Sequence, residues 1–92
     1  MILSNEPGFY KKNKYGIRIE SLVLVTKSSY KDFLEFKTLT LFPYERDLIK
    51  VNLLNNEQRT WINNYHSYVY KKLSRSLLND HRKWLFRKTR TI

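Results

Sequence analysis

The sequence contains no cysteine, and it has only two glycines and two prolines among its 92 residues. A chain without cysteine has neither disulfides nor thiolate metal ligands, which fits a reducing compartment. The longest aliphatic run, Leu22 to Val25, is far shorter than the ~20 apolar residues that a membrane span needs. The first residues show neither the basic nor the apolar region of a signal peptide. We therefore expect a cytoplasmic protein without a membrane partner.

Acidic residues are also scarce, because 18 Lys and Arg stand against 8 Asp and Glu, for a net charge of +10. The excess is concentrated in residues 55–92, which carry nine basic and two acidic side chains. Such an excess can draw a protein to nucleic acid or to an acidic surface. A solvated basic face explains the same composition without any partner, so charge alone leaves both interpretations open.

The first half of the chain has the composition of short strands. Pro7 and Gly8 form a tight corner, and because a residue before proline is held extended, Glu6 should end the first strand. Beyond the corner, aliphatic and β-branched residues alternate with polar turn residues. The predicted extended segments are Ile2 to Asn5, Phe9 to Tyr10, Ile17 to Val25 (a central strand) and Phe33 to Leu41.

The second half changes to a helical period. Asn55 followed by Gln58 three residues later predicts a capping box at a helix start. Asn79 and Asp80 can cap a second helix. The apolar and aromatic residues recur at helical spacing: Trp61, Tyr65, Tyr68, Val69 and Leu73 in the first helix, and Trp84, Leu85 and Ile92 in the second. Strands followed by two helices indicate an α+β fold, with a boundary near residues 42–54.

Two acids stand out in the strand region. In a strand from Ile17 to Val25, Arg18 and Glu20 share one face, and a carboxylate buried there needs a compensating cation, metal or donor set. One interpretation is an Arg18–Glu20 ion pair at a sheet edge, with Glu6 a solvated turn residue. The other is that the two strands bring Glu6 and Glu20 together, and carboxylates suit divalent ions such as Mn²⁺. Two carboxylates do not complete a metal shell.

Two stretches carry a specific resemblance. ILSNEPGFYKKNKYGIRIESLVLV resembles the end of the catalytic domain of Xaa-Pro aminopeptidases, which are pita-bread metallopeptidases of family M24. FLEFKTLTLFPYERDLIKVNLL, followed by WINNYH, resembles the C-terminal extension of the long, cytosolic form. The resemblance implies that residues 1–41 are the incomplete end of a pita-bread catalytic domain. Residues 42–92 would then be the extension, with its two helices.

In that family two divalent ions, commonly manganese, are held by two Asp, one His and two Glu. The resemblance maps the two glutamates onto Glu6 and Glu20, with Glu20 bridging both ions, and makes Arg18 a supporting catalytic residue. The reaction would release the N-terminal residue that precedes proline in a peptide substrate. Three of the five ligands have no counterpart here, since His66 matches a structural helix position and His81 a solvated one. We therefore expect a C-terminal fragment that is inactive alone, holds no metal by itself and needs a missing N-terminal catalytic part.

Two other functions remain open from the residues. The aromatic side chains of the helices could form a homodimer interface, or they could simply pack the helices: these are Trp61, Tyr65, Tyr68, Tyr70 and Trp84. The basic helices could bind nucleic acid, although no recognised motif accompanies their cations. Those cations are Lys71, Lys72, Arg75, Arg82, Lys83, Arg87, Lys88 and Arg90. A gene remnant without activity is a further alternative.

Overall fold

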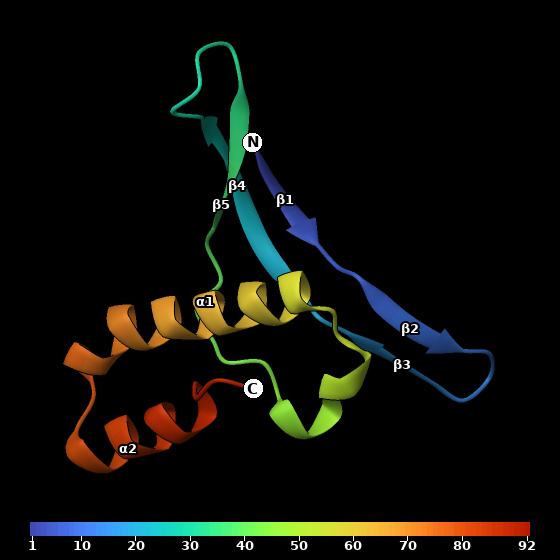
Figure 1. Cartoon of the computed structure of the whole chain (residues 1–92), viewed down its shortest axis with the longest axis vertical. Coiled ribbons are helices and arrows are strands. Elements are labelled where there is room, and N and C mark those ends of the chain that lie inside the picture. The colour runs from blue at the N-terminus through green and yellow to red at the C-terminus, as the bar shows by residue number, and fades with distance from the viewer. The chain divides into compact units, whose positions relative to one another are not determined.

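The computed structural model describes all residues, 1–92, and consists of two compact units (Figure 1). The first unit, Met1–Thr40, contains every strand, and the second, Leu41–Ile92, contains every helix. This order confirms the α+β fold class expected from the change of hydrophobic period. No helix of the structure is long and apolar enough to cross a bilayer.

The first unit is built from antiparallel strands in two sheets. One sheet has the order β1-β4-β5 and the other pairs β2 with β3. The strands are β1 (Ile2–Asn5), β2 (Gly8–Lys11), β3 (Tyr15–Arg18), β4 (Ser21–Lys27) and β5 (Leu34–Thr38). In Figure 1, β1 leads into β2 and β3 leads into β4, so the two sheets follow one another along the same pair of chain segments.

The prediction of one continuous central strand from Ile17 to Val25 is wrong. The strand is interrupted at Ile19 and Glu20, and its two halves belong to different sheets as β3 and β4. Aliphatic composition could not reveal the interruption, because the break lies opposite a proline on the paired segment. Pro7 has no N–H to donate to the ladder. The last predicted strand is also shorter, since β5 ends at Thr38.

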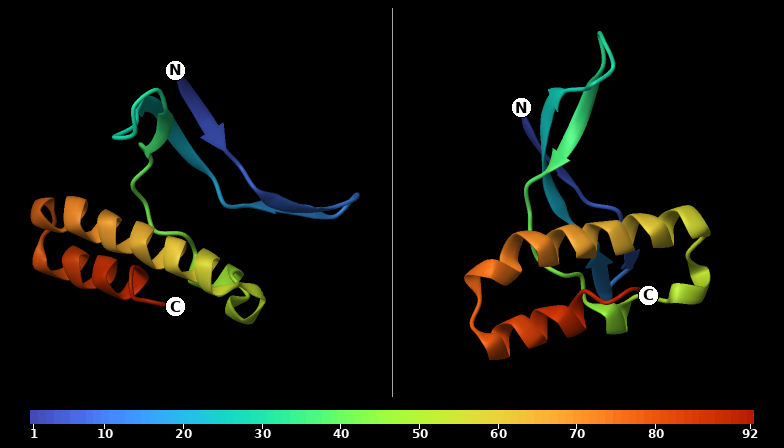
Figure 2. Two further views of the ribbon diagram at one scale, coloured as in Figure 1. Left: turned by 45° about the horizontal axis from the view of Figure 1, so that its top comes forward. Right: turned by 60° about the vertical axis from the view of Figure 1, so that its left-hand side comes forward.

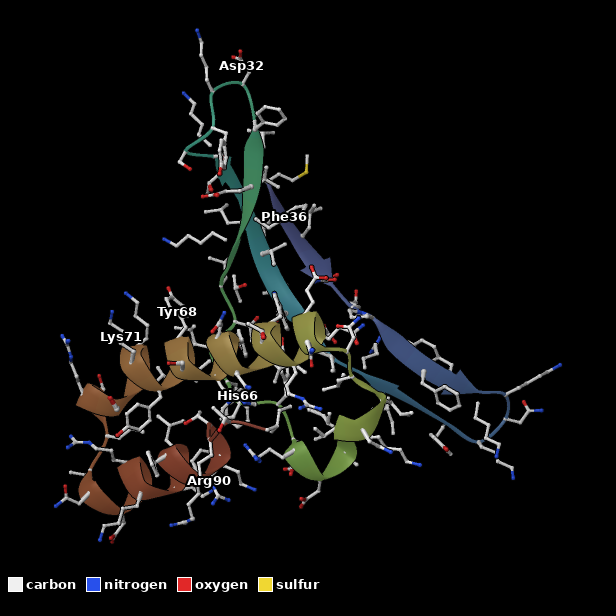
Figure 3. The ribbon with its side chains drawn as sticks, viewed as in Figure 1. Asp32, Phe36, His66, Tyr68, Lys71 and Arg90 are labelled. Atoms are coloured by element: carbon white, nitrogen blue, oxygen red, sulfur yellow. The ribbon has the colours of Figure 1, made fainter.

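The hairpin between β2 and β3 turns at Asn13, whose φ of 61° lies in the left-handed region. Asparagine tolerates that region better than most residues. The turn is closed by the Lys14 N–H, which donates to the Lys11 carbonyl over 3.0 Å. Asp32 (φ 66°) also adopts the left-handed conformation, in the loop between β4 and β5. Figure 3 shows it at the tip of that loop.

The strand unit has almost no interior of its own. Only Ser21 and Val23 are buried in it. Large apolar side chains along the strands remain exposed, among them Ile2, Phe9, Tyr10, Leu34 and Phe36. Burying apolar surface is the main driving force of folding. We therefore expect a further layer of protein to cover the exposed apolar side chains of these strands.

The helical unit contains α1 (Asn56–Leu73) and α2 (Asn79–Lys88), together with the short 3₁₀ turns η1 (Arg46–Leu48), η2 (Val51–Leu53) and η3 (Ser74–Ser76). The predicted capping box at the start of α1 is confirmed. The Asn55 side chain accepts from the Gln58 N–H over 2.8 Å, and the Gln58 side chain accepts from the Asn55 N–H over 3.1 Å. Two otherwise unpaired N–H groups of the first turn are thereby satisfied.

The second helix lies beside α1, as both views of Figure 2 show. Its start differs from the prediction, because Leu78 is the N-cap and no side chain caps the helix. Asn79 and Asp80 lie inside the first turn instead. Ile92 lies beyond the end of the helix, and its N–H donates to the Asn63 side chain of α1 over 2.9 Å.

The interior of the helical unit is centred on Tyr65, Val69 and Leu85. All three belong to the apolar and aromatic residues that recur at helical spacing in the sequence. Ile62 and His66, one position further along, are also buried, whereas Trp61 and Tyr68 are partly exposed. The buried face of α1 is therefore displaced by about one residue from the aromatic face. The sequence pattern did not show this, because His66, in the middle of the buried face, is polar.

His66 is fully buried, in keeping with its expected structural role. Its Nε2 accepts the Tyr44 N–H over 3.1 Å, which requires the tautomer with the proton on Nδ1. The neighbouring Tyr65 hydroxyl donates to the Phe42 carbonyl over 3.1 Å. Burial first, and the positive charge of Arg46 second, lower the pKa of His66 below the usual 6.5.

The helical unit should lose stability as the pH falls below about 6.5. Folded His66 stays neutral because its pKa is lowered, while the unfolded chain takes up a proton near pH 6.5. Protonation therefore favours the unfolded state, by at most about 1.4 kcal/mol per pH unit. Urea unfolding followed by the helical circular dichroism signal between pH 7.5 and 5 measures this slope.

The variant H66Q should flatten the slope, because glutamine can accept a hydrogen bond but does not titrate. H81Q, which changes the exposed histidine of α2, is the matched control and should keep the slope of the unmodified chain. An unchanged slope in H66Q would show that another group is responsible.

Candidate metal-ligand site

The two predicted ligands lie at the break between the sheets. The register passes through the break without a slip, from Asn5 paired with Ser21 to Gly8 paired with Arg18. This register sets Glu6 opposite Glu20 and Pro7 opposite Ile19. The Ile19 N–H donates to the Pro7 carbonyl over 2.9 Å, which keeps the chains together there.

One guanidinium contacts both carboxylates. Arg18 Nη1 lies 3.3 Å from Oε1 of Glu6, and Arg18 Nε lies 3.7 Å from Oε2 of Glu20. The Ser4 hydroxyl donates to the other Glu6 oxygen, Oε2, over 2.5 Å. Like charges placed opposite each other across a strand pair destabilise it, so Arg18 offsets the repulsion between the two acids.

Gly8 gives Arg18 the space to do this. A Cβ atom on Gly8 would lie 2.8 Å from the Ile17 carbonyl oxygen and 2.9 Å from Arg18 Cγ. Both separations are shorter than a normal contact, so any side chain would displace β3 or the arginine. The glycine of the Pro-Gly corner is therefore required by a close approach of two strands, besides its place in the turn.

The site is open rather than buried. Side-chain exposure is 51% for Arg18, 38% for Glu6 and 49% for Glu20. The low-dielectric layer that two buried strand faces would create around Arg18 and Glu20 is therefore absent from this chain, and the ion pairs are solvated. The Arg18–Glu20 pair and the convergence of Glu6 with Glu20, weighed as alternatives in the sequence, both occur.

The donor set fits part of a divalent metal site. Carboxylate oxygens are the hard donors that Mn²⁺ prefers, and two of them converge here. Nowhere in residues 1–92 do three or more His, Cys, Asp or Glu side chains gather as a metal group. His66 lies in the core of the other unit and His81 is exposed on α2. A complete shell would need ligands from another polypeptide segment.

Sequence reasoning missed one polar neighbour of the acids, Ser4. Its hydroxyl belongs to β1 and lies two residues before Glu6. Side chains two apart along an extended segment point to the same side, so this spacing was a usable signal.

The aromatic residues named as interface candidates divide into two groups. Tyr65 is buried and packs against Tyr44, with ring centroids 4.8 Å apart. Trp61, Tyr68 and Trp84 keep 47%, 37% and 38% of their surface exposed. Figure 3 shows Tyr68 projecting from α1 on the side away from α2. These three side chains are therefore accessible to a partner, whereas Tyr65 is buried in the core of the helical unit.

Comparison with known families gives a match over residues 32–92 to the family described as the C-terminal region of peptidase M24. The chain belongs to this family. The match covers β5 and the whole helical unit, which is the segment whose sequence resembled the long-form extension.

Relatives extend the likeness to the strand unit. A Saccharomyces cerevisiae protein named "Putative Xaa-Pro aminopeptidase FRA1" is 47% identical over 91 residues, which are 96% of this chain and 12% of that protein. "Probable Xaa-Pro aminopeptidase P" of Coprinopsis cinerea is 40% identical over 100 residues, covering 100% of this chain and 16% of that protein. The chain thus spans only a small part of the length of these family relatives.

A solved structure has the same fold. The X-prolyl aminopeptidase of Caenorhabditis elegans, described as a cytosolic enzyme with a di-nuclear active site, matches with a TM-score of 0.84 and 37% identity. The match covers 99% of this chain and 16% of that one. The fold class and the family resemblance found in the sequence are thereby confirmed.

Replacing Arg18 by methionine should weaken the strand pair at the break. Glu6 and Glu20 would then face each other without a cation, at a cost of about 0.5–1 kcal/mol for exposed charges. The expected result is roughly two- to five-fold faster exchange of the Ile19 amide hydrogen, measured by NMR.

Adding E20Q to R18M should restore slow exchange, because it removes one of the two like charges. K27M, which removes an exposed strand lysine that has no carboxylate partner, is the matched control and should leave Ile19 unchanged. Equal exchange in R18M and the unmodified chain would mean that the arginine does not hold the acids.

Proposed function

We propose that this chain supplies Glu6 and Glu20 as two ligands of a two-ion metal centre in an Xaa-Pro aminopeptidase, with Mn²⁺ as the metal. The observation that carries the proposal is the placement of the two carboxylates opposite each other at a break in the strand pair. A break of this kind, with two like charges at it, weakens the unit that contains it. A bound cation would turn that cost into a gain.

Each residue of the site has a distinct part in this proposal. Glu6 and Glu20 would hold the ions. Arg18 is a positioning residue that orients both carboxylates through its two nitrogen atoms. Ser4 fixes the second oxygen of Glu6. The metal pair, when bound, activates water and polarises the scissile carbonyl of a peptide with proline in second place.

The chain would act only with a further polypeptide part. The family's two aspartates and its ligand histidine would come from that part, because this chain places only two carboxylates at the site. The exposed apolar side chains of the strand unit support the same requirement, since a sheet of this kind needs a covering layer. We infer a cytosolic setting, which agrees with the description of the C. elegans enzyme.

Mixing the 92-residue chain with a separately expressed Asp/Asp/His-bearing part of a relative should produce Mn²⁺-dependent hydrolysis of an Xaa-Pro peptide. The chain alone should show none. E20A and E6A should each lower the reconstituted rate by at least about a hundred-fold, because each removes a metal ligand.

E35A, which removes an exposed glutamate of β5, is the matched control and should keep the rate within about two-fold of the unmodified mixture. Turnover by the chain alone would contradict the need for a partner. Full activity of the E20A mixture would remove Glu20 from the metal centre.

A second function, self-association through the helical unit, is favoured by the exposure of Trp61, Tyr68 and Trp84. Aromatic residues that stay half exposed are enriched in protein interfaces. Trp61 also stacks on Tyr65, with ring centroids 5.9 Å apart and planes 5° apart, so it would offer a rigid surface to a second copy.

Light scattering on the purified chain should therefore report a dimer that W61A/W84A converts to monomer. F36A, which removes an exposed aromatic residue of the strand unit, is the control and should leave the helical dimer intact. A monomer at high protein concentration would contradict self-association.

A further inference from the structure

We propose that a groove between the end of α1 and one face of α2 binds an acidic protein segment with one apolar anchor side chain. The groove has a volume of about 390 Å³. Its lining residues, all in the helical unit, are Tyr70, Asn79, Arg82, Lys83, Phe86 and Arg87. Neither the metal-ligand site nor the exposed tryptophans of the helical unit contribute to it.

The floor of the groove is aromatic. The rings of Tyr70 and Phe86 meet edge to face, with centroids 5.9 Å apart and planes at 72°. Phe86 is 57% exposed, although a helix of this length could have turned a polar residue outward at that position. An exposed phenylalanine braced by a second ring is the kind of surface on which a partner's apolar side chain packs.

Three cations surround this floor without carboxylate partners. The one ion pair of the helical unit joins Lys88 to Glu45, so Arg82, Lys83 and Arg87 remain uncompensated. Arg82 is held in place, because Nε donates to the Ser74 carbonyl over 2.9 Å and Nη2 donates to the Leu77 carbonyl over 3.2 Å. A fixed cation loses little freedom on binding and therefore recognises an anion well.

The charge around the groove determines the partner's chemistry. From Gln58 to the end of the chain there are nine basic residues and one acid, Asp80. A second copy of this chain that placed its own basic helices on the groove would be repelled there by like charge. An acidic segment would be attracted, and its carboxylates would reach the rim cations while its apolar side chain covers Phe86.

A protein segment fits this surface better than a nucleic acid does. Single-stranded nucleic acid needs a cationic groove that follows the backbone over several nucleotides, with an aromatic platform for successive bases. Here the aromatic floor consists of two rings in contact with each other. It offers one apolar surface, which suits one anchor side chain rather than a row of stacked bases.

The test uses a short fluorescein-labelled peptide of Asp and Glu residues with one central Phe, titrated with the full 92-residue chain at low salt. Binding should be seen by fluorescence anisotropy. K83E/R87E should weaken it by about ten-fold or more, because it reverses two rim charges. F86A, or a serine in place of the peptide's Phe, should also weaken it by about ten-fold through loss of the apolar contact.

K11E/K12E is the matched control, because it makes the same change in net charge at the β2–β3 hairpin. It should alter the affinity by less than about two-fold. The helical circular dichroism of each variant should equal that of the unmodified chain, since all the substituted side chains are exposed.

Three results would overturn the proposal. The first is no binding of the peptide by the unmodified chain. The second is an equal loss in K83E/R87E and K11E/K12E, which would mean attraction by net charge alone. The third is binding of a single-stranded RNA that depends on Phe86 and Lys83 while the peptide does not bind, which would make the groove a nucleic-acid site.

Discussion

Two carboxylates face each other across an antiparallel strand pair, and one guanidinium lies between them. The local features of the strand unit all serve to place Glu6, Arg18 and Glu20 in this arrangement. Proline interrupts the ladder, glycine allows the opposite strand to approach, and the register carries through so that the acids meet. Each of these features would weaken an ordinary hairpin. Together they place two carboxylates against one solvated arginine, which is the only cation in contact with them.

The helical unit follows a different physical rule. Its stability comes from a small core in which Tyr65 and His66 hold the chain segment that precedes the helices through hydrogen bonds to Phe42 and Tyr44. Burying a neutral histidine for this purpose ties stability to pH. The strand unit has no comparable core, and its apolar residues stay exposed. A strand unit with exposed carboxylates and apolar side chains and a helical pair with its own core therefore occur in one chain of 92 residues.

Much of the fold was predictable where one local signal was decisive. The capping box at Asn55 was predicted correctly because its two hydrogen bonds are local. The break at Ile19 and Glu20 was missed because its cause lies on the paired segment, at Pro7. The burial of Ile62 was missed because the next residue on its face of the helix, His66, is polar, so the apolar pattern does not continue along that face. The start of α2 was misplaced because side chains able to cap a helix do not always do so.

By itself the sequence determined the order of strands and helices, the family and the cationic excess, and it singled out Glu6 and Glu20 as candidates. These follow from local period, residue type and motif, none of which needs a partner far along the chain. Only the tertiary structure decided that Glu6 lies opposite Glu20, that Arg18 contacts both, and that Tyr70 and Phe86 meet below uncompensated cations. The reason is physical: register, close approach and ring contact are relations between segments distant in sequence, and they exist only once the backbone has paired and packed.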